Sequence, residues 1–292
     1  MQKFLFIISF SLLTCIFRVS AQDNVISFDG NFYKLSDYIW EAVVTNGGIN
    51  DETGLPIPGA NGTIPEMVTH NGVGYTVVAI GEKAFFGSTI EHLSIPATVT
   101  QIGTSAFAFC TGLTDVTIPV GINIVGPCAF QDCHNLKTAR WDASAKSIPF
   151  GCFSYCYTLD SVYVNPKVER IKSKAFYSCK NLKNAPTDMV CLRTIGDEAF
   201  FLCEALESLT FDCAVKEIGC NAFACCSNIK SVHCISFTPP AVGNCSIFDT
   251  EVLHDATLYL NAIDAEKYRK ATAWSQFCNI ELLQGVEDIT RQ

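Results

Sequence analysis

The sequence repeats itself at an interval near 23 residues, and this repeat restricts the chain to one kind of architecture. A phenylalanine, preceded by alanine in six of seven copies, recurs with steps of 22, 23, 23, 23, 24 and 23 residues at Phe85, Phe107, Phe130, Phe153, Phe176, Phe200 and Phe223. A fixed period of this length means that each unit is one turn of a solenoid, stacked on the turn before it. The sequence therefore predicts a stack of about seven turns with one continuous core.

The clearest copy, Ile102 to Pro119, shows what one turn contains. Three residues after its phenylalanine comes a cysteine column, formed by Cys110, Cys133, Cys156, Cys179, Cys203 and Cys226, with Ser88 in the first copy. Apolar and polar residues then alternate over Val116-Thr-Ile118, which is the period of a β-strand, and stacked turns pair such strands in parallel. The alanine before each phenylalanine must be small because the rings crowd beside it.

Glycine is frequent three residues before the Ala-Phe pair, as at Gly103. The equivalent positions also include Pro149 and Lys172, and proline holds φ negative. We therefore expect this glycine to allow close approach between turns rather than to supply a left-handed residue.

The consensus IG-x-x-AF-x-x-C-x-x-L-x-x-V-x-IP resembles the leucine-rich repeat of BspA-like surface proteins of Bacteroides and related bacteria, over roughly residues 77–234. The resemblance implies an α/β repeat solenoid with a parallel β-sheet on one face, a β-rich N-terminal cap and a small C-terminal cap. The family includes adhesins and proteins that bind hosts or other microbes. It supplies no catalytic residue to carry over.

The N-terminus is typical of a secretory signal. Lys3 precedes an apolar run from Phe4 to Phe17, and small residues suit cleavage after Ala21. A lipoprotein signal ending at Cys15 is the alternative, but threonine is a poor residue before a lipidated cysteine, so the sequence favours an exported protein without lipid attachment. No stretch is long and apolar enough to predict a stable membrane span.

The expected boundaries are a signal peptide at 1–21, an N-terminal cap at 22–79, the solenoid at 80–234, and a C-terminal cap with a short tail at 235–292. Two hairpins are predicted in the N-terminal cap, with turns at Asp29-Gly30 and Asn71-Gly72. After Cys234 the repeat phase stops, and we expect a strand over 258–260 and a helix capped by Asn261 that runs to about Lys270.

Composition limits the partners. The chain of 292 residues carries 20 basic and 29 acidic side chains, and removal of Lys3 and Arg18 with the signal gives a charge of 18 − 29 = −11. An acidic protein repels nucleic acid and anionic membranes. An extracellular protein or a glycan remains as the expected partner, and the oligomeric state is left open.

Cysteine chemistry and catalysis are the other points that the sequence addresses. Without Cys15, 15 of the 16 cysteines remain, an odd number that cannot pair completely. We expect the cysteine column to be reduced and buried, with one or two disulfides among the cysteines outside it. No C-x-x-C, H-E-x-x-H, G-x-S-x-G or phosphate-binding loop occurs, so we expect no metal, no cofactor and no enzymatic activity. His233-Cys234 is adjacent, but successive strand residues face opposite ways, which indicates a core cysteine beside a surface histidine.

Two function classes fit these features. The first is a secreted or cell-surface recognition or adhesion module that binds a protein or glycan through the solenoid face. The second is a structural or assembly component of a cell-envelope complex. An exposed aromatic patch favours the first, and a long apolar side or an unfinished solenoid end favours the second.

The candidate binding face is the outward strand position between the last two apolar columns. Down the stack this position holds Ser94, Thr117, Arg140, Tyr163, Pro186, Thr210 and His233. We expect the last six to lie side by side about 4.8 Å apart, with Ser94 displaced. The predicted ligand-binding residues are Thr117, Arg140, Tyr163, Thr210 and His233, since arginine and tyrosine are enriched at binding hot spots.

Overall fold

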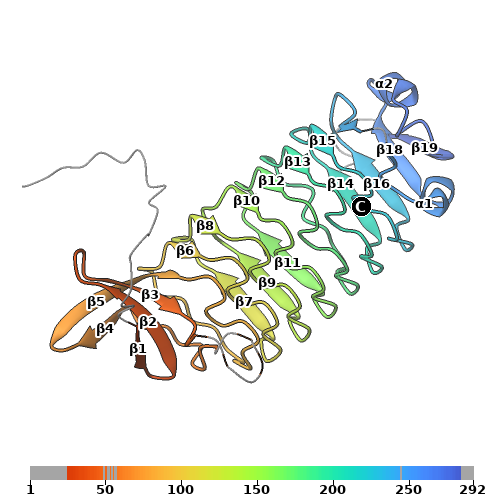
Figure 1. Ribbon diagram of the computed structural model, residues 1–292. Coiled ribbons are helices and arrows are strands. Elements are labelled where there is room, and N and C mark those ends of the chain that lie inside the picture. The colour runs from red at the N-terminus through yellow and green to blue at the C-terminus, as the bar shows by residue number, and fades with distance from the viewer. Residues whose placement is uncertain are drawn as a thin grey trace, which may run out of the picture.

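The computed structural model describes residues 25–48, 50, 53, 55, 58–243 and 245–283. These residues form an elongated β-solenoid of about nine turns, whose strands lie side by side along its length (Figure 1). The solenoid and its parallel sheets are confirmed, and the helices of the described residues lie in the C-terminal segment rather than in the repeats. The predicted signal peptide lies outside the described residues.

The N-terminal end is built from five strands. They are β1 (Val25–Phe28), β2 (Asn31–Ser36), β3 (Glu41–Thr45), β4 (Met67–His70) and β5 (Val73–Ile80). Both predicted hairpins are present, β1 with β2 and β4 with β5. Strand β3 was not predicted. It pairs with β2 antiparallel and with β5 in parallel, and β5 pairs with the first short strand of the solenoid, so the hairpins continue directly into the stack.

Each regular turn contributes one long and one short strand, and Figure 1 shows them as two rows. The long strands are β7 (Asp115–Ile118), β9 (Thr138–Trp141), β11 (Ser161–Val164), β14 (Ser208–Phe211) and β16 (Ser231–Cys234). The short strands are β6 (Gln101–Ile102), β8 (Ile124–Val125), β10 (Ser147–Ile148), β12 (Arg170–Ile171), β13 (Thr194–Ile195), β15 (Glu217–Ile218) and β17 (Ala241–Val242).

The row of long strands is interrupted, and here the sequence prediction is wrong. β7, β9 and β11 form one parallel sheet, while β14 and β16 belong to another. The fifth turn lies between them and makes only the isolated bridge of Asn184 with Ser208. Proline at 186 has no N–H to donate to a ladder, and in this turn Pro186 is buried instead of facing outward. The first turn likewise has no long strand, and Ser94 bridges Thr63 of the N-terminal region.

The core is organised by the phenylalanine column. All seven rings are fully buried. Neighbouring rings stack with centroids 5.0 to 5.6 Å apart and planes within 12° of parallel. The stack continues past the repeats, because Phe223 packs on Phe248 at 5.8 Å. Each Phe N–H also donates to the carbonyl before the next phenylalanine, as from Phe107 to Ala129 at 2.8 Å, so the columns are joined by a backbone ladder as well as by packing.

The cysteine column has a polar role that the sequence did not predict. Each thiol donates to the phenylalanine carbonyl of the preceding turn, as from Cys133 Sγ to Phe107 O at 3.2 Å; the other donors are Cys110, Cys156, Cys179, Cys203 and Cys226. Ser88 makes the corresponding bond to Gly59 at 2.7 Å. All six thiols are free and buried, as expected. Burial raises the pKa of Cys226 to about 12 and that of Cys156 well above its ordinary value, so both thiols stay protonated and able to donate.

Alkylation should therefore separate the column from the other thiols. In the folded protein, iodoacetamide is expected to label Cys213 and Cys278, which are exposed, and to leave the six column cysteines unlabelled. Unfolding in denaturant should make all six reactive. Peptide mapping by mass spectrometry provides the measurement. A disulfide-linked peptide that joins Cys133 to Cys156 would contradict the reduced column.

A disulfide lies outside the cysteine column, between Cys220 and Cys245, and agrees with the expected one or two disulfides.

The glycine prediction is also confirmed. A Cβ on Gly103 would lie 2.5 Å from the backbone nitrogen of Glu82, so the glycine permits close approach of two turns. The left-handed residues lie elsewhere, two positions before and two after each phenylalanine, as at Ser105 and Phe109.

The C-terminal segment prolongs the second sheet. Strands β18 (Thr257–Asn261) and β19 (Asn279–Leu283) continue in parallel from β16, although the sequence repeat has ended. Helices α1 (Thr250–Asp255) and α2 (Ala265–Lys270) lie beside them. The strand over 258–260 is confirmed, whereas α1 and β19 were not predicted.

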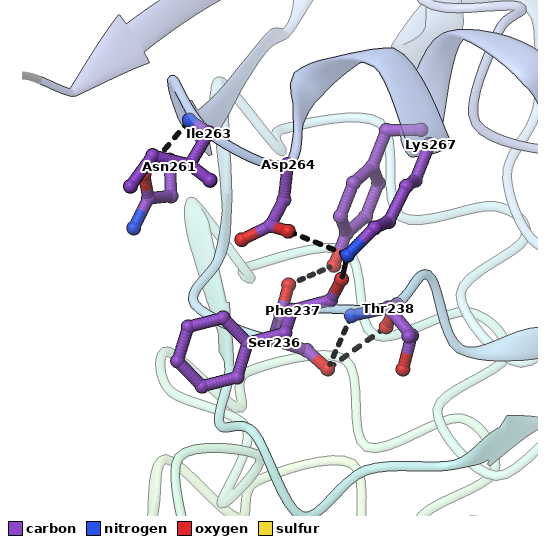
Figure 2. A network of polar contacts seen from close by, with 8 residues as sticks. Ser236, Phe237, Thr238, Asn261, Ile263, Asp264 and Lys267 are labelled. Carbon is purple, nitrogen blue, oxygen red and sulfur yellow. Dashed lines mark hydrogen bonds and ion pairs between the residues drawn. The ribbon is translucent and has the colours of Figure 1, made fainter.

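The predicted start of the last helix is wrong. Its N-cap is Asp264, and the Asn261 side chain instead accepts the N–H of Ile263 in a local turn. Asp264 is buried and its Oδ1 receives Lys267 Nζ at 2.7 Å. Lys267 also donates to the Phe237 carbonyl (Figure 2), so this network ties α2 to the chain that leaves the last repeat.

Candidate functional site

Three of the predicted residues lie side by side on the first sheet. Thr117 pairs with Arg140, and Arg140 pairs with Tyr163, in consecutive parallel strands. All three side chains are exposed. Successive strand residues point to opposite faces, and Val116 and Ile118, which flank Thr117 in β7, point into the core, as do the corresponding residues of β9 and β11. Together with the strand residues around them they border a shallow depression of about 450 Å³.

Arg140 is the most constrained of these side chains. Its guanidinium lies over the Tyr163 ring, 4.2 Å from the centroid, and its Nε donates to Asp142 Oδ2 at 2.6 Å. The hydrogen bond to Asp142 raises the pKa of Arg140, which stays charged. A planar cation stacked on an exposed ring holds both groups in one orientation, so the pair presents a prearranged surface to a ligand.

The other two predicted residues form a separate group on the second sheet. Thr210 pairs with His233, and His233 pairs with Tyr259 of β18. The rings of His233 and Tyr259 stack at 4.5 Å with planes 6° apart. Burial lowers the pKa of His233, so the imidazole is neutral at pH 7. Tyr259 was missed as a site residue because it lies beyond the last repeat, although the alternation Leu-Tyr-Leu marks it as outward-facing.

The two groups are separated by a recess at the fifth turn. Its volume is about 520 Å³, and it is bordered by β11 on one side and β14 on the other. Tyr163 and Thr210, one from each group, line it. The single row that the sequence predicts is therefore two shorter rows with a recess between them.

Cys234 is buried and His233 is half-buried, as their alternation along β16 predicts. Across the described residues, no three His, Cys, Asp or Glu side chains come together in a way that would hold a metal ion. No helix among them has the length and apolar character needed to cross a bilayer.

A further exposed cluster of large apolar side chains was not predicted as a site. Tyr38, Ile39 and Trp40 form the tip between β2 and β3, and Tyr38 is fully exposed. The tip is held in place by the Tyr75 hydroxyl, which donates to Asp37 at 2.7 Å, and by the Thr76 N–H, which donates to Trp40. The sequence signal was Tyr-Ile-Trp, which lies between the two predicted hairpins.

Comparison with known proteins identifies the repeat. The BspA type leucine rich repeat region, in six copies, matches residues 78–190 and 187–264. A leucine-rich repeat protein from Bacteroides ovatus ATCC 8483 is 20% identical with a TM-score of 0.55, over 88% of this chain and 76% of that one. A leucine rich cell surface protein from Faecalibacterium prausnitzii A2-165 is 19% identical with a TM-score of 0.41, and the match covers 93% of this chain and 98% of that one. The pneumococcal vaccine antigen PcpA is 15% identical with a TM-score of 0.35, and the match covers 90% of this chain and 99% of that one. None of the curated proteins compared with the chain matches it.

The likeness to the Bacteroides ovatus structure shows the fold alone. The family match spans more than half of the chain and covers the phenylalanine and cysteine columns, together with strands β6 to β18. The chain therefore belongs to the BspA-type leucine-rich repeat family.

Proposed function

We propose that this protein is a non-enzymatic, exported recognition module that binds an extracellular protein or glycan through the outward face of its long strands. The observation that carries the proposal is the prearranged pair of Arg140 and Tyr163, stacked at 4.2 Å on an exposed sheet face. Binding surfaces favour such rigid aromatic and guanidinium groups. Export is supported by the signal-like N-terminus and by the disulfide between Cys220 and Cys245, since disulfides persist in oxidising compartments.

Binding measurements on purified protein test the proposal. Once a screen of matrix proteins and glycans gives a ligand, Arg140→Ala and Tyr163→Ala should each weaken its binding by about 1–2 kcal/mol, roughly 5- to 30-fold in Kd. The melting temperature should change little, because neither side chain is in the core. Isothermal titration and differential scanning calorimetry give the two readouts.

The control is Lys230→Ala, an exposed residue outside both rows, which should bind normally. Unchanged affinity in the Arg140→Ala, Tyr163→Ala double variant, with the fold intact, would move the binding site off this face.

An assembly component of the cell envelope is the second candidate, because Tyr38, Ile39 and Trp40 leave large apolar side chains exposed at the N-terminal end of the solenoid. An exposed cluster of large apolar side chains marks a surface that another protein covers. If ligand binding is lost in Trp40→Ala but retained in Tyr163→Ala, the tip is the interaction surface and the assembly role is favoured.

A further inference from the structure

The recess at the fifth turn exists because the backbone turns inward there. Pro186 occupies the position that is outward in Arg140 and Tyr163, yet Pro186 and Thr187 are both buried. Thr187 N–H donates to Ala185 O at 2.8 Å in a tight local turn, which takes it out of the sheet ladder. The recess is therefore part of the backbone path and does not depend on side-chain rearrangement.

One wall of the recess is the free face of an aromatic ring. Arg140, on the neighbouring strand β9, covers one face of Tyr163. The ring also lines the recess, on the side away from β9, and Tyr163 is 47% exposed. Since the fifth turn places no outward side chain beside it, the second face of the ring is open to a ligand.

The floor contains a hydroxyl without a partner. Thr187 is 1% exposed, and its Oγ1 makes no hydrogen bond within the part of the chain that the structure describes. A buried polar group without a partner costs about 1–3 kcal/mol, so such groups are uncommon without a reason. Rotation about the Cα–Cβ bond exchanges the hydroxyl with the methyl group and breaks no hydrogen bond. A ligand in the recess can therefore supply the missing partner.

The remaining lining combines apolar side chains, among them Val162, Met189 and Val190, with a few polar groups, and it is almost uncharged. Asn184, Ser208 and Thr210 contribute an amide and two hydroxyls, and Asp188 is the one charged residue among those that line the recess. Hydroxyl and amide groups both donate and accept, which suits a ligand with many hydroxyls. The carboxylate repels anionic ligands and has no basic residue beside it in the lining to offset that repulsion.

We propose that this recess binds a neutral sugar residue of a glycan, with the apolar face of the sugar ring on Tyr163 and a sugar hydroxyl bonded to Thr187. A volume of about 520 Å³ lies within the range of small-ligand sites and is large enough for one or two sugar rings. This inference rests on the proposed function and names the ligand class for that same face.

The test uses the full-length mature protein on an array of neutral and anionic oligosaccharides, followed by titration of the strongest neutral binder. Thr187→Val preserves the shape of the side chain and removes the hydroxyl. It is expected to weaken binding at least 5-fold while the melting temperature stays the same or rises, because a buried unpartnered hydroxyl is lost. Thr104→Val is the matched control, since Thr104 is an exposed threonine outside both rows and outside the recess, and it should bind as the parent does.

Each result has a distinct meaning. Neutral glycan binding that is reduced by Thr187→Val and Tyr163→Ala, but not by Thr104→Val, supports the recess. Glycan binding that is insensitive to Thr187→Val overturns it. Binding of a peptide or protein that depends on Tyr163, with no neutral glycan bound, also overturns this inference and leaves the proposed function standing. If neither class binds through this face, the proposed function fails as well.

Discussion

Replacement of Phe153 by alanine is expected to lower the free energy of unfolding by about 3–5 kcal/mol. The side chain is fully buried in the middle of the phenylalanine column, between Phe130 at 5.6 Å and Phe176 at 5.4 Å, and Trp141 packs against its edge at 6.3 Å. Alanine would remove all three ring contacts. It would leave a cavity that the adjacent turns cannot close, because the backbone ladder from Phe130 to Cys152 and from Phe153 to Ala175 fixes their spacing.

Denaturant unfolding followed by circular dichroism measures this effect. Phe237→Ala is the matched control: the same substitution at a ring that is 65% exposed is expected to change the unfolding free energy by less than about 0.5 kcal/mol. Because turns of a solenoid contact mainly their neighbours, the Phe153 variant should also unfold over a wider range of denaturant. A loss equal to that of Phe237→Ala would show that the column does not dominate stability.

The core could be predicted from the sequence because the repeat itself reports spatial neighbours. Residues one period apart, such as Phe107 and Phe130, are in contact, and the same count places Cys110 beneath Cys133. The register of Thr117, Arg140 and Tyr163 followed from the same periodicity. In most folds such long-range contacts are invisible in a single sequence, whereas a solenoid has nearly constant sequence separation between turns.

The backbone details within a turn could not be predicted. Ser105, Phe109 and their equivalents adopt positive φ, although almost none of them is glycine. The residue types at these positions give no signal. The left-handed conformation is imposed by backbone hydrogen bonds to the next turn, which are made on both sides of the Ala-Phe pair. Ser105 and Phe109 each donate to the next turn, at 2.9 Å and 2.8 Å. This ladder compensates for a conformation that is unfavourable for a single residue.

The sequence predicted which residues lie on the outward face of the long strands, but it did not predict the shape of that face. The repeat places Pro186 in the row, but proline has no N–H for a parallel ladder, and the row of long strands is interrupted at this turn. The recess, and with it Thr187, arises from the path of the backbone and has no sequence pattern. The segments β3, α1 and β19 were missed for a related reason, since each occurs once and no repeat supports it.

A chain that ends at Cys234 is expected to aggregate instead of folding as a monomer. Strand β18 covers the edge of β16, and Trp274 packs against the buried Phe211 at 6.0 Å and donates its indole N–H to Pro240 O at 3.1 Å. Without residues 235–283, the β16 edge and the last rings of the core would face water. An open strand edge next to exposed apolar columns is a template for association with further copies.

The single substitution Trp274→Ala provides a milder form of the same experiment. It should cost about 3–5 kcal/mol in unfolding free energy, because it removes the edge contacts with Phe211 and with Tyr268 at 5.6 Å. Ile263→Ala, at a side chain that is 86% exposed on the same segment, should be nearly neutral. Light scattering and the fluorescence of a hydrophobic dye distinguish the variants. Both signals should be highest for the shortened chain and should rise to an intermediate level for Trp274→Ala on heating. For Ile263→Ala both signals should equal those of the parent. A shortened chain that is monomeric and melts cooperatively would show that the turns ending at Cys234 are stable without the C-terminal segment.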